Sequence, residues 1–143
     1  MLKHRFTVKS IFSYLIAATM IALFGCTTTS DSFRQKSVSK TVLSGEKTKL
    51  GQTWHVNKDC SFVGYLPTHV IEQPKHGRFQ LVREPVFPYE KGELAKCRTV
   101  KVQGEVGYYI SEPGYIGSDK IVVRSPSGNG RVDETIMNVN VVK

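Results

Sequence analysis

The chain has 143 residues, of which 20 are Lys or Arg and 12 are Asp or Glu, giving a formal net charge of +8. This length provides one small domain with a single hydrophobic core. The basic residues are scattered, without a run of about five like charges and without interleaved aromatic residues, so the charge does not indicate nucleic-acid binding.

Residues 1–25 have the organisation of a secretory leader. Lys3, Arg5 and Lys9 make the first part basic, and residues 11–24 form an apolar stretch without a charge. A membrane-spanning helix needs about 20 apolar residues, so this stretch is short for a span and fits the apolar region of a signal peptide. An uncleaved membrane anchor and an ordinary secretory signal are the alternatives.

The end of the leader, Leu23-Phe24-Gly25-Cys26, resembles the lipobox of bacterial lipoproteins. The resemblance implies that the Cys26 thiol receives a diacylglyceryl group, that the leader is cut before Cys26, and that the new amino terminus is acylated. Two or three acyl chains hold a protein stably on a membrane. We therefore expect a lipid-anchored protein of the bacterial cell envelope. Thr27 follows Cys26 where the inner-membrane retention signal has Asp, so in an organism with two membranes we expect the outer one, with the domain facing the periplasm.

Residues 27–44 predict a flexible tether between the lipid and the domain. The stretch is rich in Ser and Thr, mixed in charge, and almost free of large apolar residues. Such a composition buries too little apolar surface to offset the entropy lost on ordering. The expected organisation is therefore a leader over residues 1–25, lipidated Cys26 and tether over 26–44, and a folded domain over 45–143.

Two cysteines remain once Cys26 is assigned to the lipid. Cys60 and Cys97 would lie in a compartment where disulfides persist, and one intramolecular pairing is available to them. The competing hypothesis is a metal or redox pair, but the chain has no C-x-x-C motif and no His cluster beside either cysteine. We predict a Cys60–Cys97 disulfide.

The predicted domain consists of short strands separated by turns. Six prolines spread from Pro67 to Pro126 would break long helices. Apolar and polar residues alternate in the stretches 77–82, 98–102, 120–124 and 135–141, and the stretch 69–72 is ambiguous. Several short strands joined by Gly and Pro turns predict an all-β, antiparallel sandwich or barrel.

The chain also resembles the immunoglobulin-like, cadherin-like modules of bacterial surface proteins. The shared pattern is a P-x-H-G turn before one strand, then a segment rich in Tyr and Gly that ends in an Asp before the next strand. The matching residues are Pro74, His76, Gly77, Tyr109, Gly114, Tyr115, Gly117 and Asp119. The resemblance implies an immunoglobulin-like antiparallel β-sandwich.

The loop at residues 112–119 is predicted to be a turn rather than a ligand site. Gly114 and Gly117 allow backbone conformations with positive φ, and the Asp119 carboxylate can accept hydrogen bonds from turn N–H groups. Calcium takes about six to eight oxygen ligands, and the neighbourhood offers only Asp119, Glu112 and Asp133. We expect no metal and no other cofactor, and a calcium-dependent adhesion module remains an alternative.

No motif in the sequence indicates catalysis. The stretch Ser127-Gly128-Asn129-Gly130 is typical of a hairpin turn and not of a nucleophile elbow. His55, His69 and His76 are scattered and do not have the spacing of a zinc site. We therefore expect no catalytic residue and no enzymatic activity.

Residues 84–96 interrupt the strand pattern with two Pro, two aromatic residues and a charged tip. One interpretation is a long connection whose aromatic side chains cover the edge of the core. The other is a surface that binds a partner, because loops on a rigid scaffold often carry recognition and aromatic residues are enriched at interfaces. On this second hypothesis the contacts are Phe87, Tyr89 and Lys91. We expect a non-enzymatic binding or structural role with an unknown envelope protein as partner; the alternative is an inhibitor of an envelope-directed hydrolase, a lysozyme or a protease.

Overall fold

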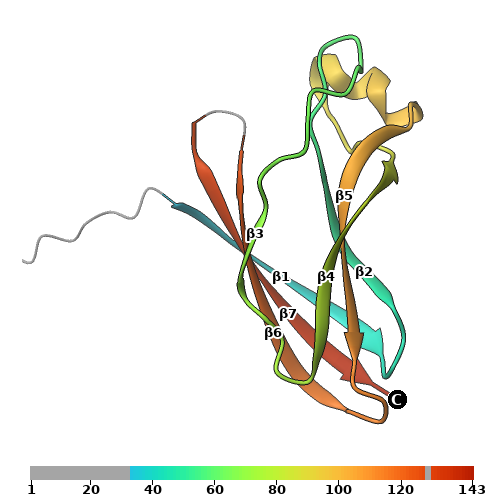
Figure 1. Cartoon of the computed structure of the whole chain (residues 1–143), viewed down its shortest axis with the longest axis vertical. Helices are drawn as coiled ribbons and strands as arrows, with labels where there is room; N and C mark the ends of the chain where they lie inside the picture. The colour runs from blue at the N-terminus through green and yellow to red at the C-terminus, as the bar shows by residue number, and fades with distance from the viewer. Residues whose placement is uncertain (1–32, 128–129) are drawn as a thin grey trace, which may run out of the picture. The chain divides into compact units, whose positions relative to one another are not determined.

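The computed structural model describes residues 33–127 and 130–143, which form an all-β domain with one short 3₁₀ helix in the described part (Figure 1). The predicted leader, the predicted lipidation site Cys26 and the first residues of the predicted tether lie outside the described residues. The elements in chain order are β1 (Phe33–Leu43), β2 (Thr48–Trp54), β3 (His69–Glu72), β4 (Gly77–Val86), helix η2 (Gly92–Thr99), β5 (Val102–Ser111), β6 (Gly117–Pro126) and β7 (Val132–Val142).

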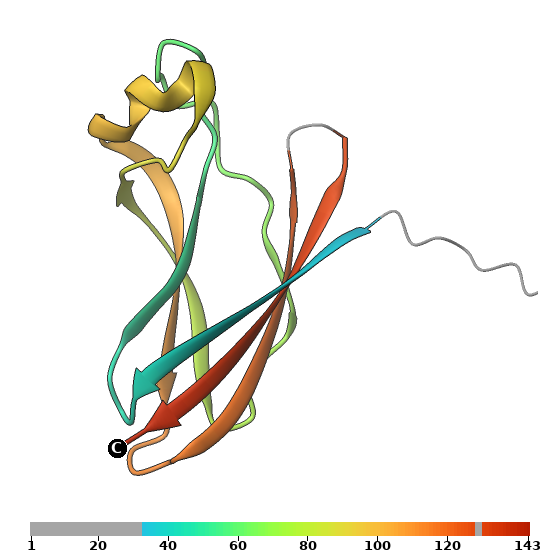
Figure 2. The same cartoon turned by 180° about the vertical axis from the view of Figure 1, so that it is seen from behind.

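The strands form two sheets, as the views from opposite sides show (Figures 1 and 2). One sheet has four strands in the order β1-β7-β6-β3, and the other has three in the order β2-β5-β4. All pairs are antiparallel except β1 with β7, which are parallel. The predicted all-β, sandwich-like fold is confirmed at this level, but the sheets are not purely antiparallel.

Strand β1 corrects the predicted tether. Phe33–Leu43 pairs along its whole length with β7, from Phe33 opposite Val132 to Leu43 opposite Val142. Only Val42 of this strand is buried, with Val38 partly buried against the core, so its order comes mainly from the backbone ladder to β7. Amino-acid composition indicates how much side-chain surface a segment can bury, but it does not indicate whether its backbone pairs with a distant strand. The predicted start of the domain, Gly45, is therefore about twelve residues too late.

The main core lies between the two sheets. Its buried members come from six strands and are Val42, Leu50, Phe79, Tyr109, Ile121, Met137, Val139 and Val141. The alternation in the stretches 77–82, 120–124 and 135–141 predicted this inward face, because side chains on a strand alternate between the two sides of the sheet. A second cluster, Val86, Val102 and Val106, packs with Trp54 at one end of the three-stranded sheet.

The predicted strand at residues 98–102 is wrong except for its last residue, Val102. Helix η2 continues to Thr99, and Val100 is exposed instead of facing the core. The fully buried Cys97 fixes this segment through its disulfide, so a covalent constraint overrides the local alternation of apolar residues. Strand β5 begins only at Val102.

The two sheets approach each other closely at the end where β5 leads into β6, and they diverge toward the end that carries η2 (Figures 1 and 2). The inner faces change character along this direction. Val139 and Val141 are fully buried near the close end, whereas Ser125, Thr135 and Glu105 add polar groups to the apolar lining toward the divergent end.

Candidate functional site

The end of the domain around η2 is called the head and comprises residues 54–66 and 87–101. It stands on the last residues of β2 and β4 and on the first residues of β5 (Figure 1). The two segments that form it have little regular structure apart from η2. A loop-built end on a rigid sheet is a common place for recognition.

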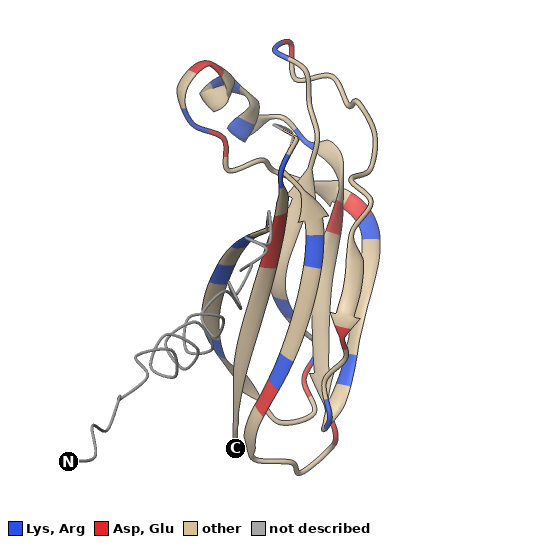
Figure 3. Ribbon diagram, turned by 90° about the vertical axis from the view of Figure 1, so that its left-hand side faces the viewer, with Lys and Arg blue, Asp and Glu red and all other residues tan. Residues whose placement is uncertain are grey.

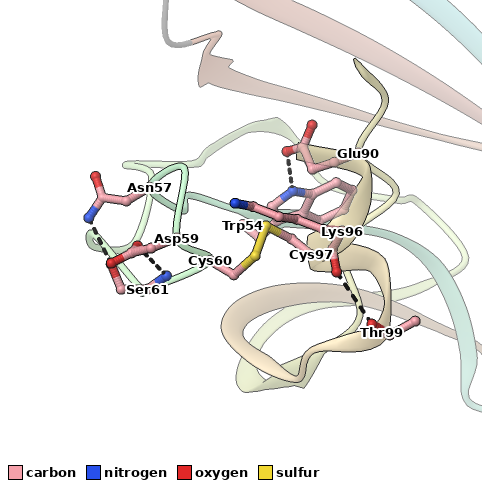
Figure 4. The surroundings of a disulfide bond; sticks show 9 residues. All are labelled: Trp54, Asn57, Asp59, Cys60, Ser61, Glu90, Lys96, Cys97 and Thr99. Atoms are coloured by element: carbon pink, nitrogen blue, oxygen red, sulfur yellow. Dashed lines mark hydrogen bonds between the residues drawn. A yellow bond between two sulfur atoms is a disulfide. The ribbon is translucent and has the colours of Figure 1, made fainter. Parts of the chain in front are cut away.

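A disulfide between Cys60 and Cys97 joins the two segments of the head (Figure 4). The Cα atoms are 5.3 Å apart, which lies in the ordinary range for a disulfide. The predicted pairing is thus confirmed. Cys60 has a φ of 69°, a left-handed conformation that costs an L-residue about 1–2 kcal/mol, so the bridge helps to hold a turn that the chain alone would disfavour.

The turn before Cys60 is fixed by side-chain hydrogen bonds (Figure 4). Asp59 Oδ1 accepts from the backbone N–H of Ser61 at 3.0 Å and from the Ser61 hydroxyl at 2.6 Å, and the Asn57 amide donates to Ser61 Oγ at 2.9 Å. The hydrogen bond from the Ser61 hydroxyl is the largest cause of the lowered pKa of Asp59. The loop is therefore ordered up to the disulfide.

Trp54 anchors the other segment of the head (Figure 4). Its indole N–H donates to Glu90 Oε1 at 2.6 Å, and its ring meets the Tyr89 ring edge to face with centroids 5.6 Å apart. The side chain of Gln52 donates to the carbonyl of Phe87 at 2.7 Å, and Pro88 is fully buried. The segment that carries the predicted contact residues is therefore held in one conformation.

Several large apolar side chains remain exposed on the head. Tyr89 is 68% exposed and Phe87 46%, and the others are Phe62, Val63 and Val100. Lys91, directly before η2, is exposed as well, and the ammonium of Lys101 lies 5.7 Å from the centre of the Phe87 ring. Phe87, Tyr89 and Lys91 thus all lie in the head with exposed side chains. Sequence reasoning missed Trp54, which ends β2, and Phe62 and Val63, which lie on the segment that the disulfide joins to η2.

The opposite end of the domain contains the residues of the predicted turn, organised around Asp119. Its two carboxylate oxygens accept four hydrogen bonds, from the backbone N–H groups of Lys75 (2.8 Å), His76 (2.9 Å) and Lys120 (2.9 Å) and from the Tyr109 hydroxyl (3.0 Å). His76 stacks on Tyr115 with ring centroids 4.2 Å apart. The carboxylate therefore ties the β3–β4 turn to β5 and β6, and its acceptor positions are taken by donors.

The environment of Asp119 shifts two pKa values in opposite directions. Burial acts to raise the pKa of Asp119, but the three backbone N–H groups and the Tyr109 hydroxyl together outweigh it and the pKa is lowered. Burial, and then the hydrogen bond to Asp119, strongly raise the pKa of Tyr109. The pair is therefore a carboxylate and a neutral phenol at neutral pH, with a structural role.

In the view of Figure 3, Lys and Arg occur together with Asp and Glu on the strands and on the head. Within residues 33–127 and 130–143 there is no group of three or more His, Cys, Asp or Glu placed to hold a metal ion. In the same part of the chain, no helix has the length and apolar character required to cross a membrane.

Comparison with known proteins adds little to this description. No family model matches the chain, and no curated protein matches it. Among solved structures, the solution structure of Amebosin aligns with 76% of this chain and 96% of its own, at 17% sequence identity and a TM-score of 0.38. A similarity this low carries no conclusion about fold or function.

Proposed function

We propose that the protein is a lipid-anchored lipoprotein of the bacterial cell envelope whose immunoglobulin-like domain binds a protein partner through the head, without catalysis. The observation that carries the proposal is the set of exposed apolar side chains on the head. Five of the nine large apolar side chains that are exposed among the described residues lie in the head, and aromatic residues are enriched at protein interfaces. A lipoprotein leader with Cys26 at its end supports the location.

The disulfide supports the same compartment. Cys60–Cys97 links the two head segments, and such bonds persist outside the reducing cytosol. A position outside the cytoplasm also suits the lipid anchor, which holds the domain at a membrane surface and leaves the head available. The parallel pairing of β1 with β7 agrees with an immunoglobulin-like arrangement in which the first strand lies beside the last.

The head suits a binding surface because Tyr89 is exposed and yet its ring is held. The Tyr89 ring rests on Trp54, whose indole is held by Glu90, and the backbone at Phe87 is held by Gln52. Side chains that are already ordered lose less entropy on binding, and each immobilised flexible side chain otherwise costs about 0.5–1.5 kcal/mol. Tyr and Trp are also the residues that most often dominate binding energy at interfaces.

Inhibition of an envelope-directed hydrolase is the second candidate. It is favoured by one observation, the 68% exposure of Tyr89 between two held points, the carbonyl of Phe87 and the side chain of Glu90. A rigid projecting side chain of this kind suits insertion into an enzyme cleft. On this candidate the partner is a lysozyme or a protease, and its activity falls when the domain is added.

Crosslinking in cells tests the proposal. The full-length chain, a Phe87→Ala/Tyr89→Ala variant and a Cys26→Ala variant are crosslinked in the native envelope, and captured proteins are identified by mass spectrometry. Ile116→Ala is the matched control, because Ile116 is 59% exposed and lies at the opposite end of β5 from the head. We expect one partner to dominate with the unaltered chain and with Ile116→Ala, and to disappear with both other variants. Capture of abundant neighbours alone, equal in all four samples, contradicts the proposal.

A further inference from the structure

A cleft of about 220 Å³ lies between the two sheets, on the side where they diverge. It is separate from the head, because both of its walls are inner faces of the sheets. The apolar part of its lining comes from five strands, namely Val38, Leu50, Phe79, Leu81, Val123 and Met137. Three of these side chains, those of Val38, Leu81 and Val123, are only partly buried, so the apolar core is incompletely covered here.

Glu105 adds a charged group to the cleft. Its side chain is only 11% exposed, and it lies in the register of the sheet between Thr53 and Arg83. Oε1 is 3.8 Å from Arg83 Nε, which is a long contact, and the buried Oε2 has no hydrogen-bond partner among the described residues. A buried carboxylate oxygen without a donor is costly. A ligand that brings a cationic group or an N–H donor to this atom would therefore gain affinity.

Two strand edges border the same cleft. Strand β1 forms its ladder with β7 and β2 forms its ladder with β5, and within the described residues no ladder joins β1 to β2. Lys36 and Val38 of β1 and Gly51, Gln52 and Thr53 of β2 line the cleft from its two sides. An edge strand presents a row of backbone N–H and C=O groups that an extended peptide can pair with.

We propose that this cleft binds an extended peptide segment of a partner protein, in which apolar residues alternate with polar ones and one inward position carries a Lys or Arg. The alternation places apolar side chains on the partly covered core, since side chains on a strand point to opposite faces in turn. The basic side chain pairs with the carboxylate of Glu105, which lines the cleft. The backbone of the segment pairs with the free edge of β2.

The test uses labelled peptides and the purified domain with its disulfide intact. The probe is a fluorescein-labelled peptide in which Val alternates with Thr and one central Val is replaced by Lys; its matched forms carry norleucine or Glu at that position. Binding is followed by fluorescence anisotropy with the unaltered domain and with Glu105→Gln. Glu112→Gln is the matched control, because Glu112 is exposed at the far end of β5.

We expect the Lys peptide to bind about tenfold more tightly than the norleucine peptide, and this preference to vanish in Glu105→Gln but not in Glu112→Gln. Thr135→Trp, which fills the cleft, should abolish binding, while Thr135→Val should keep it. The Phe87→Ala/Tyr89→Ala variant should bind the peptide normally, so failure here is distinguishable from failure of the proposed head function.

Three results would overturn the inference. The first is that none of the peptides binds, or that Lys has no advantage over norleucine. The second is that Thr135→Trp binds as well as Thr135→Val, which would place the peptide elsewhere. The third is that another occupant fills the cleft. If dodecanoate, a fatty acid, displaces a dye bound in the cleft while the peptides do not, the occupant is a lipid. If the domain self-associates and Thr135→Trp abolishes this, the occupant is a second copy of this chain.

Discussion

Replacement of Asp119 by Asn tests whether this carboxylate stabilises the end of the domain opposite the head. An amide has one acceptor oxygen where the carboxylate has two. If that oxygen stays at the Oδ1 position it keeps the N–H groups of Lys75 and Lys120, but the amide NH₂ then points at the N–H of His76. The Tyr109 hydroxyl can turn to accept from the NH₂, so the main loss falls on one backbone donor and on the charge of the acceptor.

A buried donor without its acceptor costs about 1–3 kcal/mol, and hydrogen bonds to a charged acceptor are worth about 1.5–3 kcal/mol each. We therefore expect Asp119→Asn to lower the free energy of unfolding by about 2–4 kcal/mol. This is a large fraction of the roughly 5–15 kcal/mol that stabilises a typical small domain. Tyr109→Phe removes one hydrogen bond to the same charged acceptor and should cost about 1.5–3 kcal/mol.

The assay is urea unfolding of the disulfide-intact domain at neutral pH, followed by circular dichroism. Glu112→Gln is the matched control, because it makes the same change from carboxylate to amide at an exposed residue of the neighbouring turn. This control should change the free energy of unfolding by less than about 1 kcal/mol. A small effect of Asp119→Asn, or an equal effect of the two substitutions, would refute the reasoning.

The hydrogen bonds to Asp119 also predict how the free energy of unfolding changes as the pH falls. The pKa of Asp119 is lowered in the folded state, so its contribution is present above the unfolded pKa of about 3.9 and is lost as the pH falls through the folded value. Between neutral pH and strong acid, the unaltered domain should lose more stability than Asp119→Asn does. Parallel pH profiles of the two proteins would contradict this expectation.

Three further predictions concern the head and the metal alternative. The Cys60→Ser/Cys97→Ser variant should unfold with a free energy lower by about 4 kcal/mol, because the bridge spans a sequence separation of 37 residues, and equal urea midpoints would contradict this. Trp54→Phe removes the donor to Glu90 and should cost about 1–2 kcal/mol and increase the proteolysis of the segment around Tyr89; unchanged cleavage would be the contrary result. Added calcium should leave the melting temperature unchanged, and a rise that depends on calcium concentration would restore the adhesion-module hypothesis.

Strands β4, β6 and β7, which follow the period-two rule, were predicted from the sequence, whereas β1, β2 and most of β5 were not. Met137, Val139 and Val141 alternate with polar residues and all face the core. Strand β1 has the composition of a tether and is ordered by a parallel ladder with a strand about a hundred residues away. Pairing over such a distance leaves no trace in a local window of sequence.

The candidate site was predicted in part. The hypothesis that Phe87, Tyr89 and Lys91 contact a partner rested on two prolines and two aromatic residues that interrupt the strand pattern. The structure places all three residues on the head. Trp54 was not predicted, because nothing in the local sequence tells that the end of β2 meets the segment before η2. The divergence of the sheets and the position of Glu105 in the lining of the cleft depend on how the two sheets pack. The pattern of residues along one sequence does not predict that packing.

Site-directed photo-crosslinking in cells tests the central claim most directly. A photoreactive amino acid is placed at position 89 on the head in one chain and at position 116, at the far end of the domain, in another, with all else unaltered. We predict that position 89 yields one dominant crosslinked envelope protein and that position 116 yields none of it. The same product from both positions, or no discrete product from position 89, would contradict binding through the head.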